Sequence, residues 1–169
     1  MKKLKFIYKI SLLFFFILIL LFNLGFNYFE KIDIINLIID KFNEIDKNIN
    51  NGEGYSFYLN DQGFLAWGES YILESYIEMY LATNDLYYLN KFIIHADRVI
   101  KNSDFYQQIK DYKSKIRYGW SSKKYSIDNV NHVHMVHTGV ITFPLLLFCD
   151  LVKKNNLFQY IDKLKEYLR

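Results

Sequence analysis

Three residues of this 169-residue chain carry side chains suited to proton transfer: Glu69, Tyr125 and His137. Glu69 comes near the start of an expected helix. There a carboxylate is either a favourable partner for the helix dipole or an acid/base group at the mouth of a groove. His137 is either an imidazole that contacts substrate or a buried histidine bonded to backbone. Tyr125 needs a neighbour that stabilises its phenolate before it can act as an acid or base.

Aromatic residues accompany these groups, and Trp67, Tyr71 and Trp120 are the candidates for binding substrate. Sugar rings present C–H faces that pack on aromatic rings, while tyrosine hydroxyls hydrogen-bond the polar rim. The chain has 15 Tyr and 15 Phe, so aromatic surface is plentiful. A compositional bias, with these rings filling gaps between helices, explains the same pattern. The residues therefore predict either a stacking platform for sugars or ordinary packing.

The remaining chemical groups favour neither a metal nor a cofactor. His132, His134 and His137 form an H-x-H-x-x-H cluster, but no single regular conformation places all three on one side. The single cysteine, Cys149, excludes an intramolecular disulfide and a Cys-based zinc site, and we expect it in the core. We expect His95 on the surface, at the edge of an amphipathic helix. The sequence thus predicts no metal site and no cofactor.

Two predicted helices, residues 65–82 and 86–101, must position the candidate residues. They are joined by a polar turn at residues 83–85, which makes an antiparallel αα-hairpin. On a helical wheel, Glu69 falls on the apolar face of the first helix, whereas Trp67 and Tyr71 fall on the opposite face. The second helix carries a regular apolar stripe. We therefore expect the first helix to pack against the core with one face and to line a groove with the other.

Helical periodicity recurs in the rest of the chain. We expect a helix over residues 33–50, a loop over 55–63, a short helix near 105–115 and a helix over 157–168. Residues 130–151 are strongly apolar and predicted helical in their second half, where Pro144 starts or kinks the helix. The strand signal is weak throughout. The fold class predicted is therefore all-α.

Residues 1–29 read as a membrane segment. Lysines come first, followed by an apolar run, and residues 10–29 are just long enough to span a bilayer. No small-x-small cleavage site follows, which favours an uncleaved signal-anchor over a cleaved signal peptide. The basic N-terminus predicts that residues 30–169 form a domain outside the cytoplasm, either membrane-anchored or, after cleavage, secreted or periplasmic. The net charge is +3, and the four lysines near the N-terminus more than account for it. No basic stripe appears, so we expect no nucleic-acid partner.

The stretch from Ala66-Trp67-Gly68-Glu69 through Met79-Tyr80-x-Ala82-Thr83-x-Asp85 resembles a helical hairpin of the six-hairpin (α/α)-toroid proteins. Later residues 119–120, 125–126 and 137–139 resemble the loops and inner helices of the same superfamily. It includes glycoside hydrolases, polysaccharide lyases and uronate epimerases. The resemblance implies a partial toroid of antiparallel hairpins, because a full toroid needs about a dozen helices, and a second chain is one way to complete it.

The resemblance implies a polysaccharide or oligosaccharide ligand from the cell envelope or outside the cell, with uronate-containing polymers among the candidates. Any catalysis would be that of a hydrolase, lyase or epimerase, and whether the chain is an enzyme is left open. Two alternatives remain. One is a membrane-anchored helical-repeat scaffold that binds a partner protein, and the other is a non-catalytic truncated remnant.

Overall fold

The computed structural model describes residues 33–168, which divide into two compact units at Glu44. Within the first unit, the described residues 33–44 are helical, and the helical conformation continues to residue 48. The second unit is built from helices, with one pair of two-residue strands among its described residues. The fold is therefore all-α, as predicted. The signal-anchor predicted for residues 1–29 lies outside the described residues.

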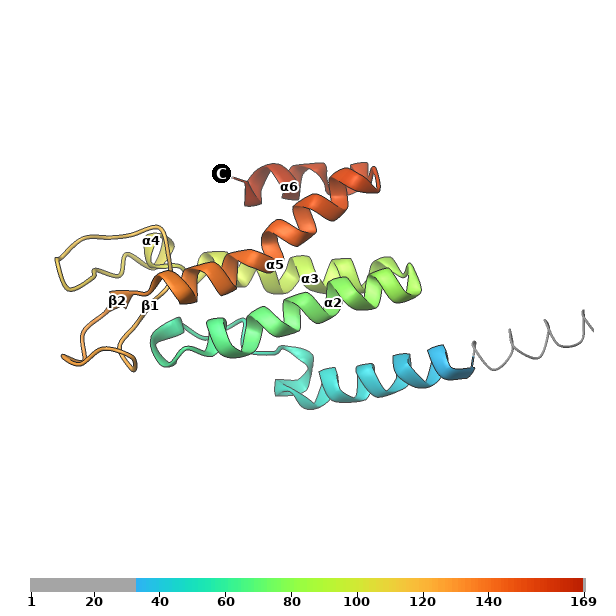
Figure 1. The fold of residues 1–169 in the computed structure, drawn as a ribbon, viewed down its shortest axis with the longest axis horizontal. Coiled ribbons are helices and arrows are strands. Elements are labelled where there is room, and N and C mark those ends of the chain that lie inside the picture. The colour runs from blue at the N-terminus through green and yellow to red at the C-terminus, as the bar shows by residue number, and fades with distance from the viewer. Residues whose placement is uncertain (1–32, 169) are drawn as a thin grey trace, which may run out of the picture. The chain divides into compact units, whose positions relative to one another are not determined.

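An antiparallel hairpin of α2 (Ser70–Thr83) and α3 (Leu86–Lys101) is the centre of the second unit (Figure 1). Asn84 ends α2 in the left-handed conformation, with φ of 57°. Asp85 then caps α3, because its side chain accepts a hydrogen bond from the Tyr87 N–H at 2.9 Å. The predicted hairpin and its turn are confirmed.

The first helix begins with a π-helical turn, Leu65–Glu69, that runs directly into α2. Leu65, Glu69, Leu73 and Tyr76 are all fully buried, which confirms that Glu69 shares the apolar face. Trp67 and Tyr71 lie on the exposed face, as the wheel predicted. The helix thus presents one face to the core and an aromatic face to the exterior.

The hairpin packs against α5 (Met135–Lys154), where the Phe92 and Phe148 rings stack at 4.8 Å. This helix begins earlier than predicted, and Pro144 lies inside it. Figure 1 shows that α5 changes direction along its length. Among the described residues, α5 alone is long and apolar enough to cross a membrane. Its buried side chains, including Ile141 and Cys149, show instead that it supplies part of the core.

The remaining elements are short. The helix α6 (Ile161–Tyr167) packs on α5, and the Tyr167 hydroxyl donates to Asp97 at 2.8 Å. The helix predicted near residues 105–115 is reduced to one turn, α4 (Asp104–Gln107), because Gln108 adopts the left-handed conformation. The strands β1 (Ser121–Ser122) and β2 (His132–Val133) pair antiparallel and hold the long loop between α4 and α5.

Candidate functional site

Trp67 and Tyr125, 58 residues apart in sequence, converge on Gly63. A Cβ on Gly63 would lie 2.9 Å from Trp67 Cδ1 and 2.8 Å from Tyr125 Cε2. Gly63 has φ of 81°, and it ends a 3₁₀ turn, Asn60–Gln62. Glycine is therefore required both for the turn and for the close approach of the two rings.

These rings border a pocket of about 270 Å³. Trp67 is 44% exposed and Tyr125 46% exposed, so each has one side in contact with the protein and one in solvent. The Tyr55 ring, which lies where a Cβ on Gly68 would meet it, closes another side and stacks on Phe64 at 5.6 Å. The lining is Tyr55, Gln62, Gly63, Phe64, Trp67, Gly68, Lys124 and Tyr125.

His137 lies behind the two rings rather than in the pocket lining. Its imidazole meets Trp67 and Tyr125 nearly perpendicularly, at 5.5 and 5.0 Å between ring centroids. Only 2% of the residue is exposed. The histidine thus supports both aromatic walls of the pocket through edge-to-face contacts.

Asn60 selects the tautomer of the His137 imidazole. Its Oδ1 accepts from the Ala66 N–H at 3.1 Å, which orients the amide so that Nδ2 faces the imidazole. Nδ2 lies 3.2 Å from His137 Nδ1 and also donates to the Trp120 carbonyl. Because an amide nitrogen only donates, His137 Nδ1 must accept, and the neutral ring carries its proton on Nε2.

Burial and, to a smaller extent, the neighbouring His134 lower the pKa of His137. The rings of these two histidines lie 5.0 Å apart. His137 is therefore neutral near pH 7, with both its preferred tautomer and its orientation set by neighbours. In this state Nε2–H is a hydrogen-bond donor and Nδ1 is already occupied, which suits a positioning role.

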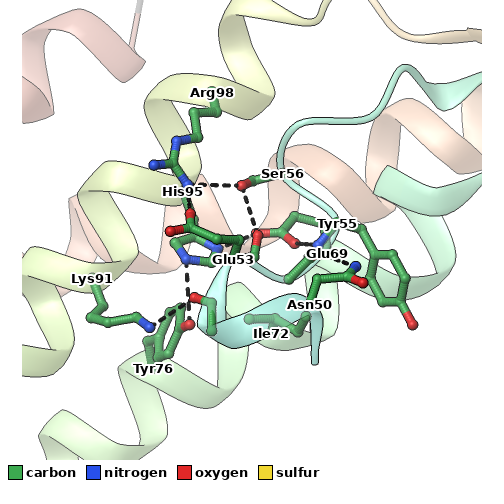
Figure 2. Close-up of polar contacts among 12 residues, drawn as sticks. Asn50, Glu53, Tyr55, Ser56, Glu69, Ile72, Tyr76, Lys91, His95 and Arg98 are labelled. Atoms are coloured by element: carbon green, nitrogen blue, oxygen red, sulfur yellow. Dashed lines mark hydrogen bonds and ion pairs between the residues drawn. The ribbon is translucent and has the colours of Figure 1, made fainter. Parts of the chain in front are cut away.

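Glu69 lies in a different place, paired with His95 inside the hairpin. Glu69 Oε1 is 2.7 Å from His95 Nδ1, and neither residue is more than 1% exposed. Glu69 Oε2 accepts from the Tyr55 N–H at 2.6 Å (Figure 2). The prediction that His95 lies on the surface is wrong, because the first helix of the hairpin covers its imidazole.

The polar cluster extends beyond this pair to Asp46. Tyr76 donates its hydroxyl proton to Asp46 Oδ1 at 2.6 Å and lies 3.5 Å from His95 Nε2. Lys91 Nζ pairs with Asp46 Oδ2 at 2.7 Å. Burial and the Asp46 carboxylate raise the pKa of Tyr76, so its hydroxyl remains protonated. Each buried charge in this cluster therefore has a partner.

The same cluster fixes the loop that carries Tyr55. A Cβ on Gly54 would lie 2.5 Å from Glu69 Oε2, so only glycine lets the loop backbone reach this carboxylate. On the other side, Arg98 pairs with Glu53, and Asn102 donates to the Ser56 carbonyl at 2.8 Å. Glu69 thus acts on the pocket indirectly, by holding the backbone of Tyr55.

Of the six residues proposed from sequence, the structure brings three together: Trp67, Tyr125 and His137. Glu69 points into the core. Trp120 is buried and donates its indole N–H to the Val99 carbonyl at 2.8 Å. Tyr71 is exposed but lies outside the pocket lining. Glu69 and Tyr71 lie on different faces of the helix, because side chains two residues apart on a helix project in different directions.

Five further residues of the site were not among the sequence candidates: Asn60, Gly63, Tyr55, Phe64 and Lys124. The sequence predicts only a loop over residues 55–63, where the structure has a 3₁₀ turn at Asn60–Gln62. Its asparagine and glycine were the available signal, since glycine at a turn suggests a positive φ. Nothing local indicated that this turn would meet the loop around Tyr125.

Among residues 33–168, no group of three or more His, Cys, Asp or Glu side chains is arranged to hold a metal ion. His132 instead pairs with Asp128 at 3.0 Å. No protein-family model, curated protein or solved structure matches the chain. The site's own geometry is therefore the basis for its function.

Proposed function

We propose that residues 30–169 form an exported carbohydrate-binding domain, anchored in the membrane by residues 10–29 and related to the (α/α)-toroid proteins. The observation that carries the proposal is the convergence of Trp67 and Tyr125, both half exposed, on Gly63. Their pocket of about 270 Å³ is close to the lower size of small-molecule sites, about 300 Å³, and suits one sugar ring. Aromatic faces supply stacking, and Gln62 supplies an amide for ring hydroxyls.

Lys124 indicates which sugar the pocket favours. It is the one charged residue in the lining, and its Nζ lies 5.7 Å from the centroid of the Tyr125 ring. A uronate carboxylate bound beside Tyr125 would gain a favourable interaction with this ammonium group. The site therefore suits uronate-containing polymers better than neutral ones.

The lining favours binding over bond cleavage. Glycoside hydrolysis by the common route needs two carboxyl groups flanking the scissile bond. None of the described residues that line this pocket is Asp or Glu, and the nearby Glu69 is engaged by His95 and Tyr55. Tyr125 is the remaining proton-transfer candidate within the pocket.

The test is calorimetric titration of the detergent-solubilised full-length chain with oligogalacturonate, cello-oligosaccharides and chito-oligosaccharides. Trp67→Ala or Tyr125→Ala should weaken binding about tenfold, which corresponds to about 1.4 kcal/mol of lost stacking. Lys124→Gln should weaken the binding of oligogalacturonate but not that of the two neutral oligosaccharides. Tyr87→Ala, which removes an exposed aromatic from α3, is the matched control. Unchanged affinity in both pocket variants, or no binding of any of the three sugars, would exclude the proposal.

A second candidate, the scaffold for a partner protein, is favoured by the outer face of α5. Val136, Phe143 and Leu146 are each about half exposed and recur at helical spacing. Such an apolar stripe suits another helix, including one from a second chain that would extend the partial toroid. Phe143→Glu with Leu146→Glu should then abolish an assembly detected by light scattering, while sugar binding stays unchanged. A monomeric parent chain would rule out self-association through this face.

A further inference from the structure

A second cavity, of about 390 Å³, lies between the loop after α3 and the helices α5 and α6. Aromatic rings make up much of its wall. They are Phe105, Tyr106, Tyr118, Trp120 and Tyr167. The run Tyr118-Gly119-Trp120 lines this cavity, whereas the first pocket uses none of these residues.

Tyr118 provides an open stacking surface at this cavity. It is 82% exposed, and its ring stacks on Phe105 at 4.6 Å with 20° between the planes. Phe105 covers one face of the tyrosine ring, so the opposite face is available to a ligand. A large exposed aromatic ring that is stacked on one face only is a suitable platform for a sugar ring.

Hydroxyl groups lie on the α5 side of the cavity. Thr138 and Thr142 both line it, and Thr142 Oγ1 donates to the Thr138 carbonyl at 2.8 Å. Thr138 Oγ1 is buried and has no hydrogen-bond partner within the described residues. The two threonines therefore place polar groups on a cavity wall that is otherwise largely aromatic.

The charge of this cavity differs from that of the first pocket. Glu166 is the one charged residue in its lining, and it accepts from Lys163 Nζ at 3.0 Å. A uronate would meet a carboxylate here, whereas it would meet Lys124 in the first pocket. This cavity therefore suits a neutral sugar ring.

The two pockets flank the first turns of α5. His137 supports Trp67 and Tyr125 in the first pocket, and Thr138 lines the second. Consecutive Cα atoms are about 3.8 Å apart, so both pockets depend on adjacent residues of one rigid helix. We infer that the cavity under Tyr118 is a second saccharide subsite, specific for a neutral ring. This rests on the proposed function and makes its ligand an oligosaccharide.

The chain's two tryptophans allow each pocket to be observed separately, because Trp67 lines the first and Trp120 the second. The full-length protein labelled with 5-fluorotryptophan should give two ¹⁹F resonances, which Trp67→Phe assigns. Cellohexaose and cellobiose are the neutral probes, and hexameric galacturonate is the charged one. We expect cellohexaose to shift both resonances and to bind at least tenfold more tightly than cellobiose.

Tyr118→Ala should abolish the Trp120 shift and the tenfold gain with chain length, while the Trp67 shift remains. Tyr125→Ala should give the reverse pattern, and Tyr87→Ala should change neither. A Trp120 resonance that no sugar moves while Trp67 responds would overturn the second subsite and leave the proposed function intact. A response of Trp120 alone would instead overturn the assignment of the first pocket as the sugar site, which carries the proposed function, and no response at either tryptophan would overturn both.

Discussion

Glu69 Oε1 lies 2.7 Å from His95 Nδ1 in the fully buried interior of the α2–α3 hairpin. The contact joins the start of one helix to the second half of the next. The other Glu69 oxygen accepts from the Tyr55 backbone. One carboxylate thus links the packing of the hairpin to a loop whose aromatic ring forms a wall of the first pocket.

Removing the Glu69 carboxylate should destabilise the domain strongly. Glu69→Leu leaves the buried His95 imidazole and the Tyr55 N–H without their acceptor, and each buried polar group left unpaired costs about 1–3 kcal/mol. Urea unfolding of the full-length chain measures the free energy of unfolding. Glu78→Leu, on the exposed face of the same helix, should change it by less than about 0.5 kcal/mol. Similar values for the two variants would contradict this account of the pair.

Gly63→Ala should reduce both stability and sugar binding. The new Cβ would collide with Trp67 and Tyr125 in a backbone conformation that L-residues rarely adopt, so we expect a loss of at least about 1 kcal/mol. Gly139→Ala is the matched control, since its Cβ meets nothing within 4 Å. Because alanine favours the helical conformation more than glycine does, Gly139→Ala in α5 should raise the free energy of unfolding by about 0.5–1 kcal/mol. Thermal unfolding and sugar titration of the two variants test the contrast.

Acidification should weaken the fold through His137. Its pKa is lowered by burial in the folded state, so the unfolded chain takes up the proton first as pH falls. The free energy of unfolding should therefore decrease as pH drops through about 6.5, the ordinary histidine value, and level off below the folded pKa. Histidine Cε1–H NMR titration reads the folded pKa directly. A value at or above 6.5 would contradict the buried, neutral imidazole.

Asp85→Ala should cost about 1 kcal/mol of stability, because it removes the side chain that accepts from the Tyr87 N–H at the start of α3. Asp85→Ser retains a capping oxygen and should restore most of the loss. Urea unfolding of the two variants gives the comparison. Equal loss in both would show that the cap contributes little to the hairpin.

The hairpin was predictable because its signals are local. Apolar residues at helical spacing define α2 and α3, and the polar turn between them carries the cap at Asp85. The same periodicity placed Glu69 on the buried face and Trp67 on the exposed one. Sequence alone therefore determined the all-α class, the central hairpin and the faces of its first helix.

Tertiary structure decided which chemical groups meet. Glu69 and His95 are 26 residues apart, and Gly63 and Tyr125 are 62 apart, so each pairing depends on how separate segments pack. Helical periodicity specifies the direction of a side chain on its own helix, but not the residue that another segment brings to it. For that reason His95 was expected in solvent and lies in the core. The same non-local packing brought Trp67, Tyr125 and His137 together.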